Sequence, residues 1–373
     1  MHVDGAAWVL EVAGAPLVRR ERSWGDPGPG LALLEVRGCG VCHTDLGYAD
    51  GSVAPRAPLP LVLGHEVVGR VLAVGTGASE SLVGRLVLAP AVSPCKRCAA
   101  CVRGRATSCT RGRMPGNDAD GAFATHTFVP AHDVVALPEP TDGAGTIGRA
   151  SLYPWQLAPI SDAATTAEQA LERAKVVLGD VAIFVGAGGV GGFGAQLARL
   201  RGARVIAIDR AAARLEALAT LVDETIDASG LEARDVRARV RETIERRGWS
   251  GAPVRVFETS GTPAGQKVAF DLLTRGGSLS VVGFTPEAVS LRLSNVMALD
   301  AEVFGNWGCD PALYGGVVSA ALEGALSVAP FVEARPLDEV NDVLERMHQG
   351  ALQKRVVLVP ATGATTPQPR RTA

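Results

Sequence analysis

Cysteine and histidine side chains that could bind a metal lie near the start of the chain. Cys42 is followed about 20 residues later by a Gly-His-Glu motif that contains His65. A thiolate and an imidazole are two of the three protein ligands that a catalytic zinc needs, because its fourth position stays open. No cysteine occurs between Cys109 and Cys309 to supply the third ligand, and Asp162 is the best-placed candidate.

Four further cysteines have the spacing C-x2-C-x2-C-x7-C in a stretch rich in glycine and arginine. Four thiolates on a short loop can close a zinc tetrahedron and leave no open position, which predicts a structural zinc. An iron–sulfur cluster is the alternative for such a group. The ligands would be Cys95, Cys98, Cys101 and Cys109. We expect Cys39 and Cys309 to be structural.

A glycine-rich motif that could bind a nucleotide follows the apolar run Val181–Val185. Gly186, Gly188 and Gly191 form G-x-G-x-x-G before a helical stretch. The glycines permit a tight turn, approach of backbone N–H groups to a pyrophosphate and close packing of helix on strand, and the helix N-terminus attracts phosphate. Asp209 ends the next predicted strand, at about the spacing expected for an acid that binds the adenosine ribose.

This acid predicts a preference for NAD over NADP, because a carboxylate repels a 2′-phosphate. Arg210 and Arg214 lie close to it in sequence and could partly offset its charge. An ordinary glycine-rich turn with a surface aspartate is the alternative interpretation.

The elements that must position these residues change in character along the chain. Up to about residue 160, short apolar runs are broken by glycine and proline, which is typical of strands joined by turns. Beyond about residue 163, strands alternate with helices, which predicts a parallel sheet with helices on both faces. We expect strands at Leu31–Val36, Val67–Val74, Leu86–Ala89, Val181–Val185, Val205–Ile208, Val254–Phe257, Leu279–Val282 and Arg355–Val359, and helices at Ala211–Leu221 and Leu231–Arg247.

The composition excludes several classes of protein. The 373 residues, 47% hydrophobic and 20% charged, exclude a disordered or fibrous protein, and the length favours two domains. The net charge of −2 gives no sign of a nucleic-acid or membrane partner. Without a run of 18 apolar residues or a signal peptide, we expect a cytoplasmic protein. The polar tail Ala361–Ala373 is expected to be disordered.

At these motifs the sequence resembles the zinc-dependent medium-chain alcohol dehydrogenases, and the resemblance extends from Gly38 to Arg355. It implies an α/β protein with a GroES-like, β-rich catalytic domain formed by residues 1–163 and 307–373. A Rossmann domain with a doubly wound parallel sheet would occupy residues 164–306. It further implies two zinc ions per chain, NAD rather than NADP, a small-molecule alcohol or ketone substrate, and a homodimer or homotetramer.

The resemblance also implies roles for single residues. Thr44 would accept the alcohol proton, and Asp45 would orient His65. The catalytic zinc site would comprise Cys42, His65 and Asp162, with Glu66 beside them. The cofactor would contact His43, Gly186, Gly188, Gly189, Val190, Gly191, Asp209, Arg210, Arg214, Ser260, Val282, Gly283 and Arg355.

Other stretches resemble one branch of this family, the 6-hydroxycyclohex-1-ene-1-carbonyl-CoA dehydrogenases. They are Met114–Asp118, Ser260–Gln266, Val281–Thr285, Arg292–Asn295 and Gly305–Cys309. The resemblance implies interconversion of a cyclic or allylic secondary alcohol and its ketone, on a free compound or a CoA thioester. The pocket would be lined by Tyr48, Ala91, Trp155 and Trp307. The phosphates of CoA could meet a basic cluster that is otherwise a solvated face: Lys96, Arg97, Arg103, Arg105, Arg111 and Arg113.

One departure from the wider family concerns the proton relay. Gly47 stands where many members carry a histidine, so the proton would leave through Thr44, the ribose and water, or another group. This leaves two alternatives to an alcohol dehydrogenase: an NAD(P)H-dependent reductase of a conjugated C=C or C=N bond, and a non-catalytic nucleotide-binding protein. The presence of Cys42, His65 and Thr44 disfavours the non-catalytic alternative.

Overall fold

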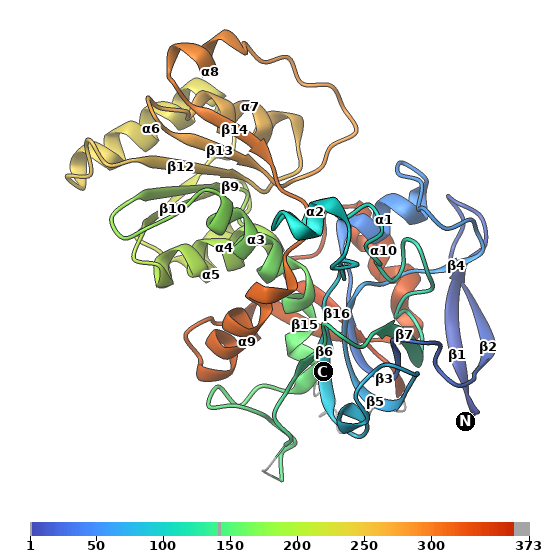
Figure 1. The fold of residues 1–373 in the computed structure, drawn as a ribbon. Coiled ribbons are helices and arrows are strands. Elements are labelled where there is room, and N and C mark those ends of the chain that lie inside the picture. The colour runs from blue at the N-terminus through green and yellow to red at the C-terminus, as the bar shows by residue number, and fades with distance from the viewer. Residues whose placement is uncertain (1, 141–142, 362–373) are drawn as a thin grey trace, which may run out of the picture. The chain divides into compact units, whose positions relative to one another are not determined.

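The chain forms two units in a computed structural model that describes residues 2–140 and 143–361 (Figure 1). The first unit comprises Met1–Asp162, Tyr314–Gly324 and Val332–Ala373, and the second comprises Ala163–Leu313 and Ala325–Phe331. After Ala361, the tail predicted to be disordered lies outside the described residues.

The second unit is built on a six-stranded parallel sheet in the order β11-β10-β9-β12-β13-β14. Its strands are β9 (Val181–Val185), β10 (Arg204–Asp209), β11 (Glu224–Asp227), β12 (Val254–Glu258), β13 (Ser278–Val281) and β14 (Glu302–Gly305). The helices are α3 (Ala163–Arg173), α4 (Gly189–Leu200), α5 (Ala212–Leu218), α6 (Ala233–Arg246), α7 (Pro263–Asp271) and α8 (Ser294–Ala298). This is the doubly wound order, in which ligands bind at the carboxyl ends of the strands where the order reverses, between β9 and β12.

The apolar strands of this sheet form because both faces are covered. All five residues of β9 are buried, as expected for a central strand between two layers of helices. The predicted strand Val181–Val185 has the observed bounds, whereas β13 ends one residue before its predicted end. Val282 instead donates its N–H to the carbonyl oxygen of Glu258 across the end of the sheet.

The first unit contains a seven-stranded sheet in the order β15-β16-β3-β5-β6-β8, with β7 also paired to β3, and a smaller sheet in the order β2-β1-β4. The strands are β1 (Val3–Leu10), β2 (Val18–Trp24), β3 (Leu31–Gly40), β4 (Leu61–Val62), β5 (Glu66–Val74), β6 (Leu86–Ala89), β7 (His126–Pro130), β8 (Val135–Ala136), β15 (Val332–Pro336) and β16 (Arg355–Val359). The helices are α1 (His43–Asp50), α2 (Ala99–Val102), α9 (Tyr314–Glu323) and α10 (Val340–His348).

Short 3-10 helices complete both units. They are η1 (Glu80–Leu82), η2 (Ala106–Ser108), η3 (Pro154–Ser161), η4 (Pro311–Leu313), η5 (Ala329–Phe331) and η6 (Leu337–Glu339). None of the helices within residues 2–140 and 143–361 has the length and apolar run needed to cross a membrane.

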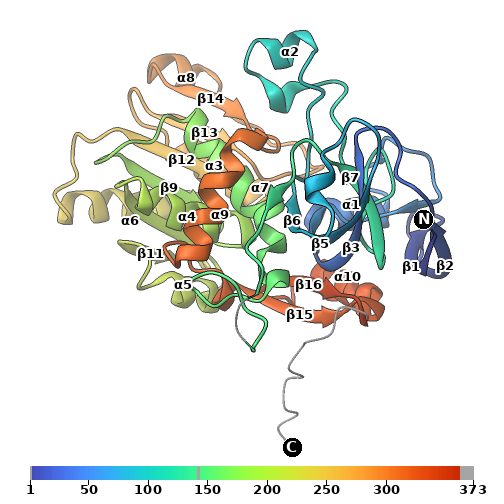
Figure 2. The same ribbon diagram turned by 60° about the horizontal axis from the view of Figure 1, so that its bottom comes forward.

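Strand β3 is longer than the predicted Leu31–Val36. A register shift between Val36 and Gly38 lets its pairing with β5 continue to Gly40, and Cys39 and Gly40 then pair with β16. The hairpin of β1 and β2, side by side in Figures 1 and 2, was not predicted. Most of β2 is exposed and charged, so it lacks the apolar run that identifies a strand.

Candidate functional site

A cluster of four potential metal ligands lies within the first unit. Ligand atoms of Cys42, His65, Glu66 and Asp162 all lie within 4.8 Å of one another. Cys42 is the N-cap of α1, His65 and Glu66 stand at the start of β5, and Asp162 follows the last turn of η3. Three separate segments therefore converge on one point.

The buried carboxylate of Asp45 fixes two of these segments relative to each other. One oxygen accepts a hydrogen bond from the backbone N–H of Cys42 at 2.9 Å, which caps α1. The other accepts from the backbone N–H of Gly64 at 3.0 Å and lies 3.4 Å from Nδ1 of His65. The imidazole is thereby directed with Nε2 toward the cluster.

Close backbone packing requires glycine beside the cluster. Gly64 has a φ of +96°, and a Cβ atom there would lie 2.6 Å from the ring of Phe123. A Cβ atom at Gly40 would lie 1.9 Å from Oε2 of Glu66. The carboxylate of Glu66 thus occupies the space that any larger residue at position 40 would need.

Asp162 is positioned by a residue from near the other end of the chain. The hydroxyl of Tyr314, in α9, donates to the carbonyl oxygen of Ser161 at 2.6 Å. The backbone N–H of Ala91 donates to the same carbonyl at 3.2 Å. All three residues are buried, so the turn that presents Asp162 is held on both sides. Tyr314 was not singled out from the sequence, since nothing local to it indicates a role.

The distances within the cluster match those around a zinc ion. Asp162 Oδ2 lies 3.5 Å from His65 Nε2 and 3.6 Å from Cys42 Sγ. A tetrahedron with ordinary zinc–ligand distances has N–O and S–O edges of about 3.4 and 3.6 Å. Nε2 of His65 is fully buried and has no hydrogen-bond partner of ordinary geometry among the described residues. Three donors of the right chemistry, one of them this ring nitrogen, therefore fit a zinc ion.

Neighbouring charges determine the protonation of His65. Burial by itself would lower the pKa of His65, but the carboxylates of Asp45 and Asp162 and the thiol of Cys42 raise it well above its ordinary value. The cluster therefore favours a positive charge at its centre, which a metal cation would supply.

Glu66 is paired with Arg355 on the other side of the cluster. Nε of Arg355 donates to Glu66 Oε2 at 3.1 Å, and Nη2 donates to Oε1. Burial raises the pKa of Glu66 to about 7, although the charge of Arg355 opposes this. Only 7% of the Arg355 side chain is exposed. Arg355 was expected to contact the cofactor; the structure shows its pairing with Glu66, and the cofactor contact stays a prediction.

The other residues expected around the cluster have varied environments. Thr44 Oγ1 lies 3.7 Å from Cys42 Sγ. Tyr48 and Ala91 are buried, whereas Trp155 is only partly exposed and stacks on Tyr153. His43 is exposed at the first position of α1. Trp307, in the second unit, has half of its surface exposed.

The second cysteine group also has the geometry of a metal centre. The sulfurs of Cys95, Cys98, Cys101 and Cys109 lie within 4.8 Å of one another. Cys98 Sγ is 3.4 Å from Cys101 Sγ and 3.7 Å from Cys109 Sγ, close to the edge of about 3.8 Å in a zinc–sulfur tetrahedron. Backbone N–H groups lower the pKa of the Cys95 thiol to about 6, whereas burial raises that of Cys101 to about 12.

In the second unit, the residues expected to bind a cofactor gather at the carboxyl edge of the sheet. Gly186 follows β9 with a φ of +101°, and Gly188 is the N-cap of α4. A Cβ atom at Gly191 would lie 1.8 Å from the carbonyl oxygen of Gly186. Ser260 follows β12, and Val282 and Gly283 follow β13. These loops meet where the strand order reverses.

Asp209 at the end of β10 is already engaged with the backbone. Oδ2 accepts from the N–H of Ala187 at 2.6 Å, and Oδ1 accepts from the N–H groups of Arg210 and Ala211. Arg214 Nη1 lies 3.8 Å from Oδ2. The acid thus links the glycine loop to the start of α5, with a guanidinium beside it.

Glu258 is a residue of this edge that sequence reasoning missed. It is fully buried at the end of β12, and Oε1 accepts from the N–H groups of Ser260 and Gly261 and from the Ser260 hydroxyl. Its carbonyl oxygen accepts from Val282 and Gly283. Burial raises the pKa of Glu258. The available signal was its place as an acid directly after an apolar strand, which Asp209 shares.

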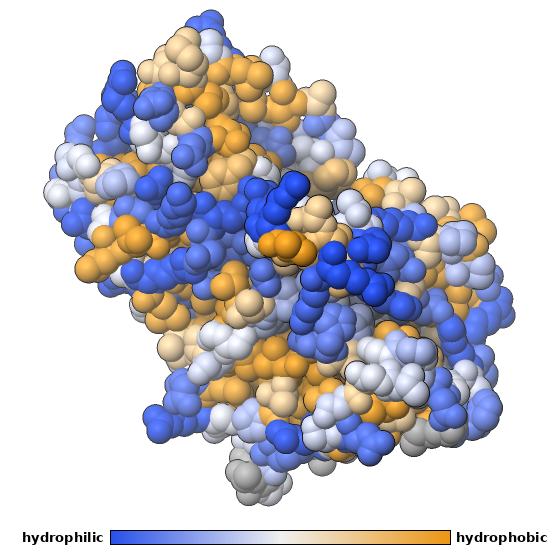
Figure 3. All heavy atoms as spheres, in the orientation of Figure 1, coloured by the Kyte–Doolittle hydropathy of each residue, from blue (hydrophilic) through white to orange (hydrophobic). Residues whose placement is uncertain are grey.

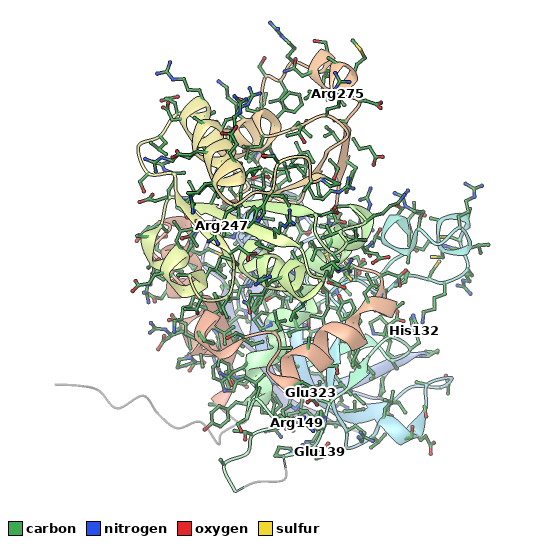
Figure 4. The ribbon with its side chains drawn as sticks, turned by 90° about the vertical axis from the view of Figure 1, so that its left-hand side faces the viewer. His132, Glu139, Arg149, Arg247, Arg275 and Glu323 are labelled. Atoms are coloured by element: carbon green, nitrogen blue, oxygen red, sulfur yellow. The ribbon has the colours of Figure 1, made fainter. Side chains whose placement is uncertain are left out.

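A separate depression of about 410 Å³ lies elsewhere on the first unit, beside the ion pair of Arg149 and Glu323. These two side chains lie close together in Figure 4. The depression is lined by Arg85, Val135, Ala136, Leu137, Pro138, Gly315, Val318, Ser319, Leu322 and Glu323. None of these was expected in a site.

Comparisons with known proteins match both units. The Alcohol dehydrogenase GroES-like domain family matches residues 28–139, and the Zinc-binding dehydrogenase family matches residues 189–323. An alcohol dehydrogenase of Geobacillus stearothermophilus is 29% identical over 94% of this chain and 98% of its own length. The solved structure of AibC is 30% identical over 96% of each chain, with a TM-score of 0.82. The alcohol dehydrogenase of Aeropyrum pernix is 28% identical over 95% of this chain and 100% of its own, also with a TM-score of 0.82.

Proposed function

Since this chain belongs to the zinc-binding medium-chain alcohol dehydrogenase family and is an oxidoreductase, we propose that it interconverts a cyclic or allylic secondary alcohol and its ketone with NAD. The observation that carries the proposal is the meeting of Asp162 with Cys42 and His65 at distances that suit zinc. The open position of such a site is where an alcohol oxygen binds.

The proposed mechanism assigns a task to each residue around the cluster. Cys42, His65 and Asp162 would hold a zinc ion, and Asp45 keeps the His65 ring oriented. Bound zinc supplies a Lewis acid that lowers the pKa of an alcohol, and NAD⁺ supplies a hydride acceptor. Thr44 accepts the proton of the alcohol at Oγ1 and passes its own hydroxyl proton on to the cofactor ribose or to water, so that its hydroxyl is unchanged after the relay. The guanidinium of Arg355 offsets the negative charge of Glu66, so this carboxylate adds little negative charge to the cluster.

For the cofactor we propose NAD rather than NADP. In a nucleotide bound at this sheet edge, the adenosine ribose would lie beside the carboxylate of Asp209, of which only 9% is exposed. Arg214, 3.8 Å away, reduces the repulsion of a 2′-phosphate without removing it. A moderate preference for NAD is therefore expected.

For the substrate we propose a ring-containing alcohol, either free or as a CoA thioester. Ala91 is buried near the turn that presents Asp162, and its small side chain would take less space from a ring-shaped substrate than a larger side chain would. A reductase of a conjugated C=C or C=N bond is the second candidate. It is favoured by Gly47, because α1 then lacks the histidine that ends the proton relay of many alcohol dehydrogenases.

The test is NADH formation by the zinc-loaded protein with NAD⁺ and paired substrates. One is the cyclohexenyl alcohol as its CoA thioester, and the other is its free acid or a simple cyclic alcohol. Turnover of either supports the alcohol dehydrogenase. Absence of turnover with both, together with oxidation of NADPH or NADH by an enone, would replace it with the reductase.

We also propose that the protein is a homodimer or homotetramer of the cytoplasm. Strand β14 lies at the end of its sheet, and large apolar side chains of the same stretch are exposed, including Phe284, Leu293, Met297 and Val303. An open strand edge beside apolar surface is suited to pairing with a second copy. Sedimentation of the wild type and Val303→Lys tests this, and a monomeric wild type would refute it. A cluster of four metal-type thiols, with a further thiol at the other metal site, suits a reducing compartment.

A further inference from the structure

The loop that carries the four-cysteine centre is strongly basic. Residues 96–113 contain six cationic side chains and no aspartate or glutamate. The cations are Lys96, Arg97, Arg103, Arg105, Arg111 and Arg113. The proposed mechanism uses none of them, and all six are exposed.

Lys96 has a structural task that separates it from the arginines. Its Nζ lies 2.6 Å from Oδ1 of Asp133, whose side chain is only 2% exposed. Oδ2 of the same carboxylate lies 3.1 Å from Nε2 of His132, which also contacts the carbonyl oxygen of Pro94. This group fastens the start of the loop to the body of the first unit.

The arginines have no comparable partner. Within residues 2–140 and 143–361, none of the five forms an ion pair, although Arg113 acts on the nearby carboxylate of Asp118. Four arginines therefore remain without an acidic partner in that part of the chain: Arg97, Arg103, Arg105 and Arg111. The positive charge of these four arginines exceeds the negative charge that four thiolates retain after they bind one Zn²⁺.

The loop holds these arginines on a short, braced scaffold. Arg103 is the C-cap of α2 and Arg105 is the N-cap of η2, and Gly104, with a positive φ, turns the chain between them. Backbone N–H groups of both arginines donate into α2, to Ala99 and Ala100. The four clustered cysteine sulfurs hold the segments of the loop together. A surface braced in this way loses little freedom when it binds a ligand.

The rest of the chain limits what this surface can bind. The whole chain has a net charge of −2, so without the six cations of the loop it has a net charge of −8. A long polyanion such as nucleic acid would meet repulsion beyond the loop. A compact anion with several phosphate groups would meet only the arginines, which bind phosphate oxygens in a forked geometry. In Figure 3, hydrophilic surface lies beside a smaller hydrophobic group at the place of α2, whose Val102 is exposed.

We infer that the exposed arginines of residues 97–111 form a binding site for a compact anion with several phosphate groups, such as the nucleotide end of a thioester substrate. This rests on the proposed function for the role of the ligand, but not for its binding. The site then anchors the non-reacting end of the substrate on the unit that carries the catalytic cluster.

The test measures binding of adenosine 3′,5′-bisphosphate by calorimetry, with NADH at saturation so that the cofactor site is occupied. AMP serves as the ligand with one phosphate. The variant Arg103→Gln/Arg105→Gln is compared with Arg237→Gln/Arg241→Gln, which removes the same charge from exposed positions on α6. We expect about tenfold weaker binding in the loop variant, none or little change in the α6 variant, weaker binding of AMP, and loss of affinity as salt is added.

Equal affinity of the wild type and the loop variant would overturn the inference. Zinc content is measured in each variant; if the loop variant loses zinc, Arg97→Gln/Arg111→Gln takes its place. In turnover assays, the loop variant should raise the KM for a CoA thioester and leave that for the free alcohol unchanged. Bisphosphate binding by a wild type that oxidises no alcohol would refute the proposed function and leave this site standing.

Discussion

At the scale of single residues, the third ligand position of the metal cluster sets the chemistry of the site. A carboxylate at Asp162 donates less charge to a zinc ion than a thiolate would, so the metal stays a stronger Lewis acid. Because Asp162 also raises the pKa of His65, its removal leaves two ligands with altered protonation. The position is therefore the most informative one to change.

We expect Asp162→Ala to bind about one zinc ion per chain instead of two, because two protein ligands do not hold a catalytic zinc. Activity should fall by about 100-fold or more. Metal analysis by mass spectrometry checks the stoichiometry. Asp162→Cys is the matched control and should keep two zinc ions, since thiolate is a zinc ligand. Two zinc ions in Asp162→Ala would remove Asp162 from the site.

We expect Asp209→Asn to reduce the preference for NAD over NADP by about tenfold, the effect of about 1.4 kcal/mol. The substitution removes the charge that repels a 2′-phosphate and keeps one acceptor oxygen, which can serve the N–H groups of Arg210 and Ala211 while the bond from Ala187 is lost. That loss affects both cofactors, so the ratio between them reports the charge. The ratio of kcat/KM for the two cofactors is the readout. An unchanged ratio would mean that another residue decides the choice.

The metal ligands could be predicted from the sequence because cysteine and histidine are common metal ligands and their spacing is typical of metal sites. The pairing of Glu66 with Arg355 could not, since 289 residues separate them and only the fold brings β16 beside β3. The role of Tyr314 could not be predicted for the same reason. Its hydroxyl acts on a carbonyl 153 residues away, and a tyrosine in a helix carries no local sign of this.

At the scale of elements, the cofactor edge depends on a buried acid that joins two loops. Glu258 holds the loop after β12 through its side chain and the loop after β13 through its carbonyl oxygen. Both loops contain residues expected to contact the cofactor. The geometry of the edge therefore depends on a residue that need not touch the cofactor itself.

We expect Glu258→Ala to raise the KM for NAD⁺ about tenfold, a change of about 1.4 kcal/mol. It should lower the free energy of unfolding by about 2 kcal/mol, because buried N–H groups lose their acceptor. Glu258→Gln retains an accepting oxygen and should restore much of the affinity. Titration of NADH fluorescence and denaturant unfolding measure the two effects. Equal affinity of both variants and the wild type would contradict this role.

Helix α9 provides a second test at this scale. Tyr314→Phe removes the hydroxyl that donates to Ser161 and leaves the ring, so we expect a loss of about 1 kcal/mol in stability. Because that turn presents Asp162, zinc should also leave the variant faster in the presence of a chelator. Tyr153→Phe, at the N-cap of η3, is the control. The same rate of zinc loss in all three proteins would separate α9 from the site.

Elements with continuous apolar runs were predicted best. The bounds of β6, β9 and β16 agree with the prediction from sequence, because burial of a strand on both faces leaves an unbroken apolar run. The end of β3 depends on a bulge and on a partner strand from the other end of the chain. The charged strand β2 forms because it pairs with β1, and the composition of β2 does not indicate that pairing.

At the scale of the whole molecule, the four-cysteine loop makes little regular structure and relies on its metal. It contains only two short helical turns, α2 and η2. Metal binding supplies the folding free energy of such loops. Loss of the metal should therefore disorder this loop while the rest of the chain stays folded.

We expect the Cys98→Ser variant to be cleaved by trypsin within residues 96–113, where arginines are frequent, under conditions in which the wild type resists. Mass spectrometry of the fragments locates the cut. Asp162→Ala, which keeps the four cysteines, is the control and should resist at this loop. Cleavage at the same rate in wild type and Cys98→Ser would show that the loop is ordered without metal.

The first unit is assembled from separate stretches of the chain, and this affects how it folds during synthesis on the ribosome. Strand β3 and the metal ligands leave the ribosome long before β16 and Arg355, which complete their sheet and pair with Glu66. At about 5–20 residues per second, the interval from Asp162 to Arg355 takes roughly 10–40 s. During that time the second unit is synthesised up to Phe331, while the first unit still lacks β16 and the arginine that pairs with Glu66. The order of synthesis thus makes the last strand the step that closes the catalytic unit.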